Sequence, residues 1–101
     1  YNRGDRRHED VVAYCTQQKI AFIPWFPVAA GKLAQSGGPL DAMAKKHGAT
    51  VAQLAIAWLL HRSPVMLPIP GTATVRHLEE NVAAAAITLS DADAAALASA
   101  V

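Results

Sequence analysis

The sequence predicts an α/β fold with a parallel sheet, and three observations support this prediction. Two short segments, residues 20–28 and 65–70, are apolar at every position, as strands buried on both faces of a parallel sheet are. Amphipathic helical patterns alternate with these two segments along the chain. Glycine, proline and helix-capping residues separate the segments. Together these features favour two parallel strands with flanking helices.

The first quarter of the chain predicts a loop, a helix and a strand. Residues 1–7 contain turn-forming Asn, Gly and Asp, so we expect a loop there. A helix is expected from about residue 8 to residue 19, with one buried stripe formed by Val11, Val12, Cys15 and Tyr14. The first strand should be ordered only over about residues 21–24, because Pro24 and Pro27 carry no N–H for a ladder.

Two helices are predicted after a loop of small residues at 29–39. The first spans residues 40–47 and ends at Gly48. The second opens on a capping box, in which Thr50 and Gln53 satisfy each other's backbone N–H groups, and runs to about Arg62. Its apolar face consists of Val51, Leu54, Ala55, Trp58 and Leu59.

The last part of the chain repeats the strand–turn–helix order. Ser63 and Pro64 end the preceding helix, and the second strand covers residues 65–70. Gly71 and Thr72 form the turn, and Thr74 caps a helix that carries Val75, Leu78 and Val82. A last helix is expected from residue 90 to about residue 100.

Two parallel strands cannot by themselves make a covered sheet. A parallel pair needs helices on both faces and further strands at its edges. We therefore expect residues 1–101 to be a single partial domain, incomplete on its own, and the missing initiator Met agrees with this expectation.

Composition excludes several classes of protein. The 101 residues are 52% apolar and 17% charged, which argues against disorder. No apolar run approaches the ~20 residues of a membrane span, and a net charge of +1 gives no electrostatic reason to bind nucleic acid or an anionic membrane. The single cysteine, Cys15, excludes an internal disulfide and fits a reducing compartment such as the cytoplasm.

The loops after the two strands are the places where chemistry is expected. In α/β folds, functional loops follow the carboxyl ends of strands. After residue 70, the N–H groups at a helix start, the hydroxyls of Thr72 and Thr74, and Arg76 could bind a phosphate. An ordinary capped helix explains the same residues. Both interpretations stay open from spacing alone.

Other chemistry-bearing residues give weaker signals. Trp25 follows a strand, so its ring either stacks on a planar ligand or belongs to the core. Trp58 lies on an apolar helix stripe and is expected in the core. None of the histidines has a partner at metal-binding spacing, and His47 and His61 are expected to be surface caps. No nucleophile is followed by a base, so we predict neither a metal site nor catalytic residues within the chain.

The sequence resembles the C-terminal portion of an aldo-keto reductase over nearly its whole length. The matching motifs are residues 1–2 with Arg7 and 9–11, the segment IAFIPWFPVAAGK at 20–32, residues 48–60, and LPIPGTATVRHLEENV at 67–82, with 89–91 also similar. The last of the long segments is quite specific, and its pairing with Pro-Trp-Phe-Pro makes a chance match improbable. The resemblance implies about the last third of a (β/α)8 TIM barrel, from the end of the sixth strand through the eighth strand and the C-terminal helices.

The resemblance also implies a nicotinamide cofactor and residues that bind it. Trp25 falls where the family stacks an aromatic ring on the nicotinamide. Gly71, Thr72 and Ala73 would approach the adenosine 2′-phosphate, and Glu80 and Asn81 would hydrogen-bond the adenine. Backbone groups in the loop after the seventh strand would line the pyrophosphate. The cofactor-binding set from that loop is Phe26, Val28, Gly31 and Lys32.

Two departures from the family pattern affect the choice of cofactor. Many members have Lys where this chain has Gly71 and Arg where it has His77, which would together clamp the 2′-phosphate. Arg76 could replace part of that clamp. We therefore expect NADP as the cofactor, with NAD possible.

The resemblance implies a carbonyl reductase whose catalytic residues lie elsewhere. The family's catalytic Asp, Tyr, Lys and His come from the first half of the barrel, and no residue here matches them. The whole enzyme would transfer a hydride from NAD(P)H to a small carbonyl substrate, whereas the isolated chain should be inactive and should self-associate. The alternatives are a non-catalytic nucleotide-binding module and an oligomerising barrel fragment. A small helical DNA-binding protein is disfavoured because the chain has no basic stripe.

Overall fold

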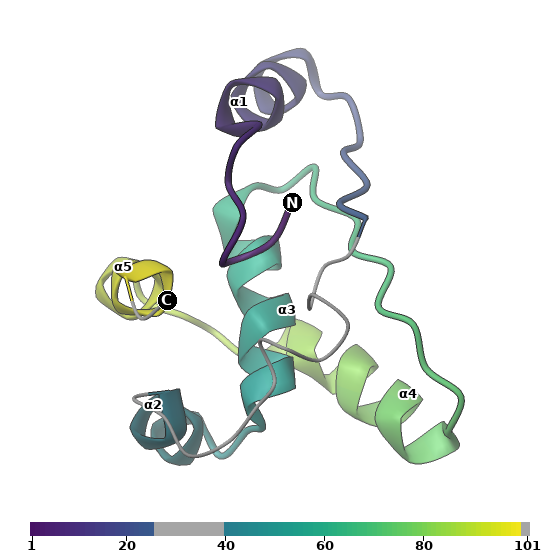
Figure 1. Cartoon of the computed structure of the whole chain (residues 1–101), viewed down its shortest axis with the longest axis vertical. Coiled ribbons are helices and arrows are strands. Elements are labelled where there is room, and N and C mark those ends of the chain that lie inside the picture. The colour runs from purple at the N-terminus through teal and green to yellow at the C-terminus, as the bar shows by residue number, and fades with distance from the viewer. Residues whose placement is uncertain (26–39, 100–101) are drawn as a thin grey trace.

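The computed structural model describes residues 1–25 and 40–99, in which helices surround one central helix. The elements in chain order are α1 (Glu9–Gln18), α2 (Leu40–His47), α3 (Val51–Arg62), α4 (Val75–Ala83), the 3-10 helix η2 (Ala84–Ala86) and α5 (Asp91–Ser99). In Figure 1, α3 lies in the middle, α2 and α5 lie on one side of it, and α4 extends from the other side. Helix α3 contacts α2, α4, η2 and α5, so it organises the fold.

The helix ends confirm the capping predictions. At the start of α3, the Thr50 hydroxyl accepts from the N–H of Gln53 at 3.1 Å, and the Gln53 side chain accepts from the N–H of Thr50 at 2.9 Å. The hydroxyl of Ser90 caps α5 at 3.0 Å. After α2, Gly48 has φ +59°, a conformation that glycine adopts without strain. These ends form where short-range chemistry predicts them.

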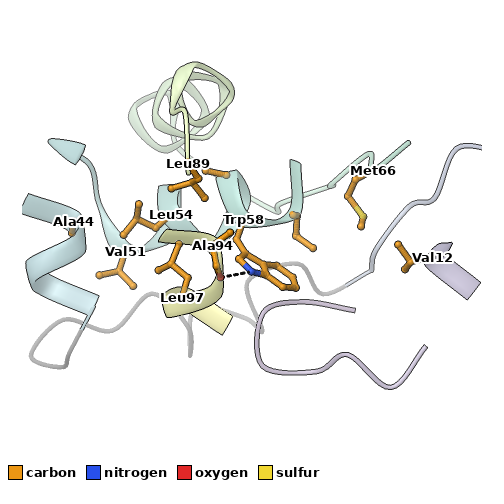
Figure 2. Packing of buried hydrophobic residues seen from close by; sticks show 11 residues of the cluster. Val12, Ala44, Val51, Leu54, Trp58, Met66, Leu89, Ala94 and Leu97 are labelled. Atoms are coloured by element: carbon orange, nitrogen blue, oxygen red, sulfur yellow. Dashed lines mark hydrogen bonds between the residues drawn. The ribbon is translucent and has the colours of Figure 1, made fainter. Parts of the chain in front are cut away.

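The hydrophobic core is centred on α3, as its apolar face predicts. Leu54, Trp58 and Leu59 of this helix are buried, together with Leu97 of α5. Figure 2 shows the indole of Trp58 lying against α5, where its Nε1 donates to the carbonyl of Ala94 at 3.2 Å. Burial removes apolar surface from water, and this bond satisfies the polar atom that burial would otherwise leave unpaired. Trp58 is therefore a core residue, as predicted.

The two predicted strands meet in a single parallel bridge between Phe22 and Met66. The N–H of Phe22 donates to the carbonyl of Val65 at 2.9 Å, and the N–H of Leu67 donates to the carbonyl of Phe22 at 2.8 Å. Within residues 1–25 and 40–99, the pairing is limited to this one bridge and does not continue into a β-strand ladder. Prolines at both segments contribute no ladder donor. The parallel direction agrees with the prediction, whereas the ladder is shorter than predicted.

Helix α1 differs from the prediction of one buried stripe. Only Val12 of this helix is buried, while Val11 and Tyr14 are exposed and Cys15 is partly exposed. The predicted helix is confirmed, but a helical pattern does not specify how many residues of its apolar stripe contact a neighbouring element. A single residue, packed in the core cluster, anchors the apolar side of α1.

The side of the molecule formed by the bridged segments and α4 carries many exposed apolar residues. Side chains with large exposed fractions occur on the bridged segments and on α4, which has no buried residue at all. They are Ile20, Ile23, Trp25, Leu67, Ile69, Val75, Leu78 and Val82. We refer to these eight residues as the uncovered apolar side. Such a large exposed set marks a surface that normally meets a partner or a ligand.

Hydrogen bonds and ion pairs hold α5 in place. The buried Arg3 donates to the carbonyl of Leu97 near the end of α5 at 3.0 Å. Asp93 is bound by Lys46 at 2.8 Å and by His47 at 3.0 Å. His47 is therefore a partly buried partner of α5, which corrects its prediction as a surface cap. His61, at the end of α3, pairs with Asp91 at 3.2 Å.

None of the helices in the described ranges combines the length and the apolar character needed to cross a bilayer. Over the same residues, no three His, Cys, Asp or Glu side chains gather in a way that could hold a metal ion.

Candidate functional site

The parallel bridge gives the two candidate segments, residues 20–25 and 65–74, a common direction. In Figure 1 both segments run from the level of the last turn of α3 toward the level of α4. Trp25 ends the first segment and the turn at residues 71–74 ends the second. The carboxyl ends of parallel strands are where α/β folds place their ligands. The described structure therefore contains a candidate site at this end.

Trp25 lies on the surface at this end, with 74% of its area exposed. The amino group of Tyr1 donates to the Trp25 carbonyl at 3.3 Å, so a backbone contact holds this residue while most of its surface faces solvent. The interpretation of Trp25 as core is therefore wrong. An exposed indole is available for stacking, which remains a prediction.

The turn after the second segment is closed by its own hydroxyl groups. The N–H of Thr74 donates to the Thr72 hydroxyl at 3.3 Å, and the N–H of His77 donates to the Thr74 hydroxyl at 3.2 Å. Thr74 is thus the cap of α4, as predicted. At Gly71 an added Cβ would meet open space, so no neighbouring atom forces a glycine here. The open face of this turn can admit a ligand.

Helix α4 brings Arg76 and Glu80 together one turn apart. Nε of Arg76 donates to Oε1 of Glu80 at 3.1 Å, and the guanidinium is largely exposed. A guanidinium has five N–H donors, so this ion pair does not saturate it. Asn81, the next residue, is half-buried. Arg76 and the two predicted adenine-binding residues thus lie on one helix, and the predicted 2′-phosphate residues Gly71, Thr72 and Ala73 lie in the turn just before it.

Sequence reasoning missed a polar link between α3 and α4. The side-chain Nε2 of Gln53 donates to the backbone carbonyl of Glu80 at 2.9 Å. The capping-box pattern predicted the role of the Gln53 oxygen at Thr50, but nothing in the pattern indicated where the nitrogen would bind.

A second missed feature joins Tyr1, Glu9 and Arg62. The phenol of Tyr1 and the guanidinium of Arg62 both donate to the Glu9 carboxylate. Burial of the phenol, and then the adjacent Glu9, raise the pKa of Tyr1 above its ordinary value. The Tyr1 ring also stacks on Trp58, with ring centres 6.1 Å apart. This cluster fixes the N-terminal loop and α1 against the end of α3.

Part of the predicted cofactor set lies outside the described residues. These positions are Phe26, Val28, Gly31 and Lys32. Of the predicted set, the structure places Trp25, Gly71, Thr72, Ala73, Arg76, Glu80 and Asn81.

Comparison with solved structures defines the class of fold. The aldo/keto reductase from Klebsiella pneumoniae, solved in complex with NADP and acetate, superposes with a TM-score of 0.85 at 35% sequence identity. The match covers 96% of this chain and 36% of that chain. The chain therefore has the fold of part of a (β/α)8-barrel oxidoreductase.

The family follows from the sequence itself. The model of the Aldo/keto reductase family matches residues 1–101, so the chain belongs to this family. It is 56% identical over 90 residues to the uncharacterized oxidoreductase C215.11c of Schizosaccharomyces pombe, covering 89% of this chain and 29% of that protein. It is 42% identical over 91 residues to pyridoxine 4-dehydrogenase of Escherichia coli, covering 90% of this chain and 32% of that protein. The chain thus spans about a third of the length of these curated relatives.

Proposed function

We propose that this chain is the C-terminal portion of an NAD(P)H-dependent aldo-keto reductase and carries the cofactor-binding side of its barrel. Residues 1–101 would run from the end of the sixth strand through the eighth strand and the closing helices. The observation that carries this proposal is the common direction of the two bridged segments, which brings Trp25 and the start of α4 to one end.

Each candidate residue has a proposed role toward the dinucleotide. The exposed ring of Trp25 would stack on the nicotinamide, and the turn at residues 71–73 with Arg76 would bind the 2′-phosphate. Glu80 and Asn81 would hold the adenine. The pyrophosphate would lie along the segment that contains Phe26, Val28, Gly31 and Lys32.

The reaction of the whole enzyme would be reduction of an aldehyde or ketone. The cofactor, when bound, would supply the hydride, and a tyrosine outside this chain would supply the proton. Residues of this chain would bind and orient the dinucleotide. Because no residue here matches the family's proton donor, the isolated chain should not reduce carbonyls.

NADP is the proposed cofactor, and NAD remains an alternative. Arg76 lies at the start of α4, where its charge and the helix dipole both favour an extra phosphate. Gly71 and His77 lack the two fixed positive charges that the family pattern often has there. The preference for NADP over NAD should therefore be modest.

Fluorescence titration tests this proposal, because the two tryptophans of the chain differ in exposure. NADP+ should quench wild-type emission through the exposed Trp25. In the variant Trp25→Phe the remaining indole, Trp58, is only 4% exposed and should respond little. Equal quenching of the two proteins, or none in the wild type, would contradict the proposed stacking. Robust carbonyl reduction by the isolated chain would contradict the absence of a proton donor.

A stand-alone nucleotide-binding module is the alternative. It predicts the same titration but a start codon adjacent to Tyr1. Upstream codons for further strands and a catalytic Tyr and Lys would instead support the barrel portion.

Self-association is the second property that we propose, and it rests on the uncovered apolar side. The eight exposed apolar residues on the bridged segments and α4 are a surface that a second copy could cover.

A further inference from the structure

The Gln53 side chain connects the beginning of α3 with the last turn of α4. Its Oε1 accepts from the N–H of Thr50 at 2.9 Å, and its Nε2 donates to the carbonyl of Glu80 at 2.9 Å. The two bonds use the two ends of one amide. They also fix its orientation, because only the nitrogen can donate to a carbonyl.

The Glu80 carbonyl lies in the last turn of α4, where several carbonyls share one backbone donor. Helix α4 ends at Ala83, and the N–H four residues ahead of Glu80 belongs to the cap residue Ala84. The N–H of Ala84 is directed to several of these carbonyls at once, including that of Glu80. Gln53 therefore supplies a separate donor where the backbone supplies a shared one.

The link matters because α4 has little else to fix its position. None of its side chains is buried, and its apolar residues belong to the uncovered apolar side. A helix without buried side chains gains little from hydrophobic packing. The amide of Gln53, which is held on the central helix, is a direct polar contact between that helix and α4.

We propose that Gln53 is a positioning residue for nucleotide binding, acting through the last turn of α4. This inference rests on the proposed function, because it takes Glu80 and Asn81 as the adenine-binding residues. Gln53 touches the helix backbone and not the nucleotide. Its amide sets where the Glu80 backbone lies and therefore where the two adenine-binding side chains start.

One substitution separates this role from helix capping. Gln53→Glu keeps an oxygen acceptor for the Thr50 N–H and places a negative charge at the start of α3, where the helix dipole favours it. It also removes the donor to Glu80. The gain at the start of α3 and the lost contact to α4 act on stability in opposite directions, so the melting temperature of this variant should change little, while its affinity for NADP+ falls about fivefold, as expected for one lost hydrogen bond.

Two further variants of the full chain control the experiment. Gln53→Met is neutral and removes both bonds, so a similar loss of affinity shows that the new charge is not the cause. Thr50→Val removes the hydroxyl cap of α3 but keeps the amide of Gln53, so it should lower the melting temperature and leave NADP+ affinity unchanged. A purely structural role would instead make affinity follow stability in all three variants.

The measurements distinguish failure of the positioning role of Gln53 from failure of the proposed cofactor-binding function. Wild-type affinity in Gln53→Glu overturns the positioning role. If the wild type binds no NADP+, the proposed function fails, and the link itself is then tested by amide hydrogen exchange. Faster exchange at residue 84 in Gln53→Glu than in Thr50→Val would support the link, and equal exchange would overturn it.

Discussion

The two sides of the molecule are built in different ways. On one side, α3 packs against α5 and α2, and the largest apolar side chains at this contact, Leu54, Trp58 and Leu59 of α3 and Leu97 of α5, are closed off from solvent. On the other side, the bridged segments and α4 expose most of their apolar side chains. Helices occur on both sides, and the helix α4 is exposed where α3 is covered, so the difference lies in what packs over them.

This difference separates stability from the candidate chemistry. The predicted cofactor-binding residues that the structure describes all lie on the bridged segments, the turn or α4, and none belongs to the core cluster. The core can hold α3 in place while the exposed side meets a ligand or further polypeptide. We therefore expect substitutions on the two sides to have different effects.

The largest expected effect is on the packed side. Leu97→Ala removes a side chain that is 1% exposed, and it should lower the free energy of unfolding by about 2–5 kcal/mol. The matched control Leu78→Ala, at 52% exposure on α4, should change it by less than about 0.5 kcal/mol. Urea denaturation measures both, and similar costs would show that the two sides do not differ as described.

The next effect concerns the uncovered apolar side. Replacing Val75, Leu78 and Val82 together by serine should weaken self-association about tenfold, or ~1.4 kcal/mol, because apolar area is no longer removed from water. Sedimentation velocity over a concentration series measures this change. Val11→Ser on α1 is the control for an exposed apolar residue elsewhere. A wild-type chain that stays monomeric at every concentration would refute the association.

The smallest effect is a pH dependence on the packed side. The hydrogen bond from Lys46, and to a lesser extent that from His47, keep the pKa of Asp93 below its ordinary value despite its burial. A carboxyl group with a lowered folded-state pKa stabilises the fold above its unfolded-state pKa of about 3.9, and that contribution is lost as the pH falls through the folded-state pKa. The melting temperature of the wild type should thus fall more steeply below about pH 4 than that of Asp93→Asn.

Calorimetry at several pH values checks this, with Asp10→Asn as the control on an exposed carboxylate. Parallel curves of melting temperature against pH for the wild type and Asp93→Asn would show that the bonds from Lys46 and His47 to Asp93 contribute nothing to stability.

Helix boundaries could be predicted because their signals are local. Thr50 with Gln53, Thr74, Ser90 and Gly48 each lie within three residues of the backbone group or turn that they serve. Burial on α3 could be predicted because almost the whole face of this helix is covered. On α1 the same kind of pattern predicted a buried stripe that the structure does not show, because periodicity alone does not determine how many residues of a stripe contact a neighbouring element.

The candidate site was predictable only in part. The positions of Trp25 and of the turn followed from the strand–loop order, but the exposure of Trp25 depends on what packs over it. The Gln53–Glu80 bond and the Tyr1–Glu9–Arg62 cluster join residues distant in the sequence. Their geometry comes from the packing of whole helices, which no local pattern encodes.

The bridge between Phe22 and Met66 has a consequence for local opening. Two backbone hydrogen bonds hold it, and the side chains beside it are largely exposed, whereas α3 has its own helical bonds and a buried core around it. Segments with few buried contacts and few backbone bonds open at a lower free energy than a packed core. We therefore expect the amide protons of Phe22 and Leu67 to exchange with solvent before those in the middle of α3.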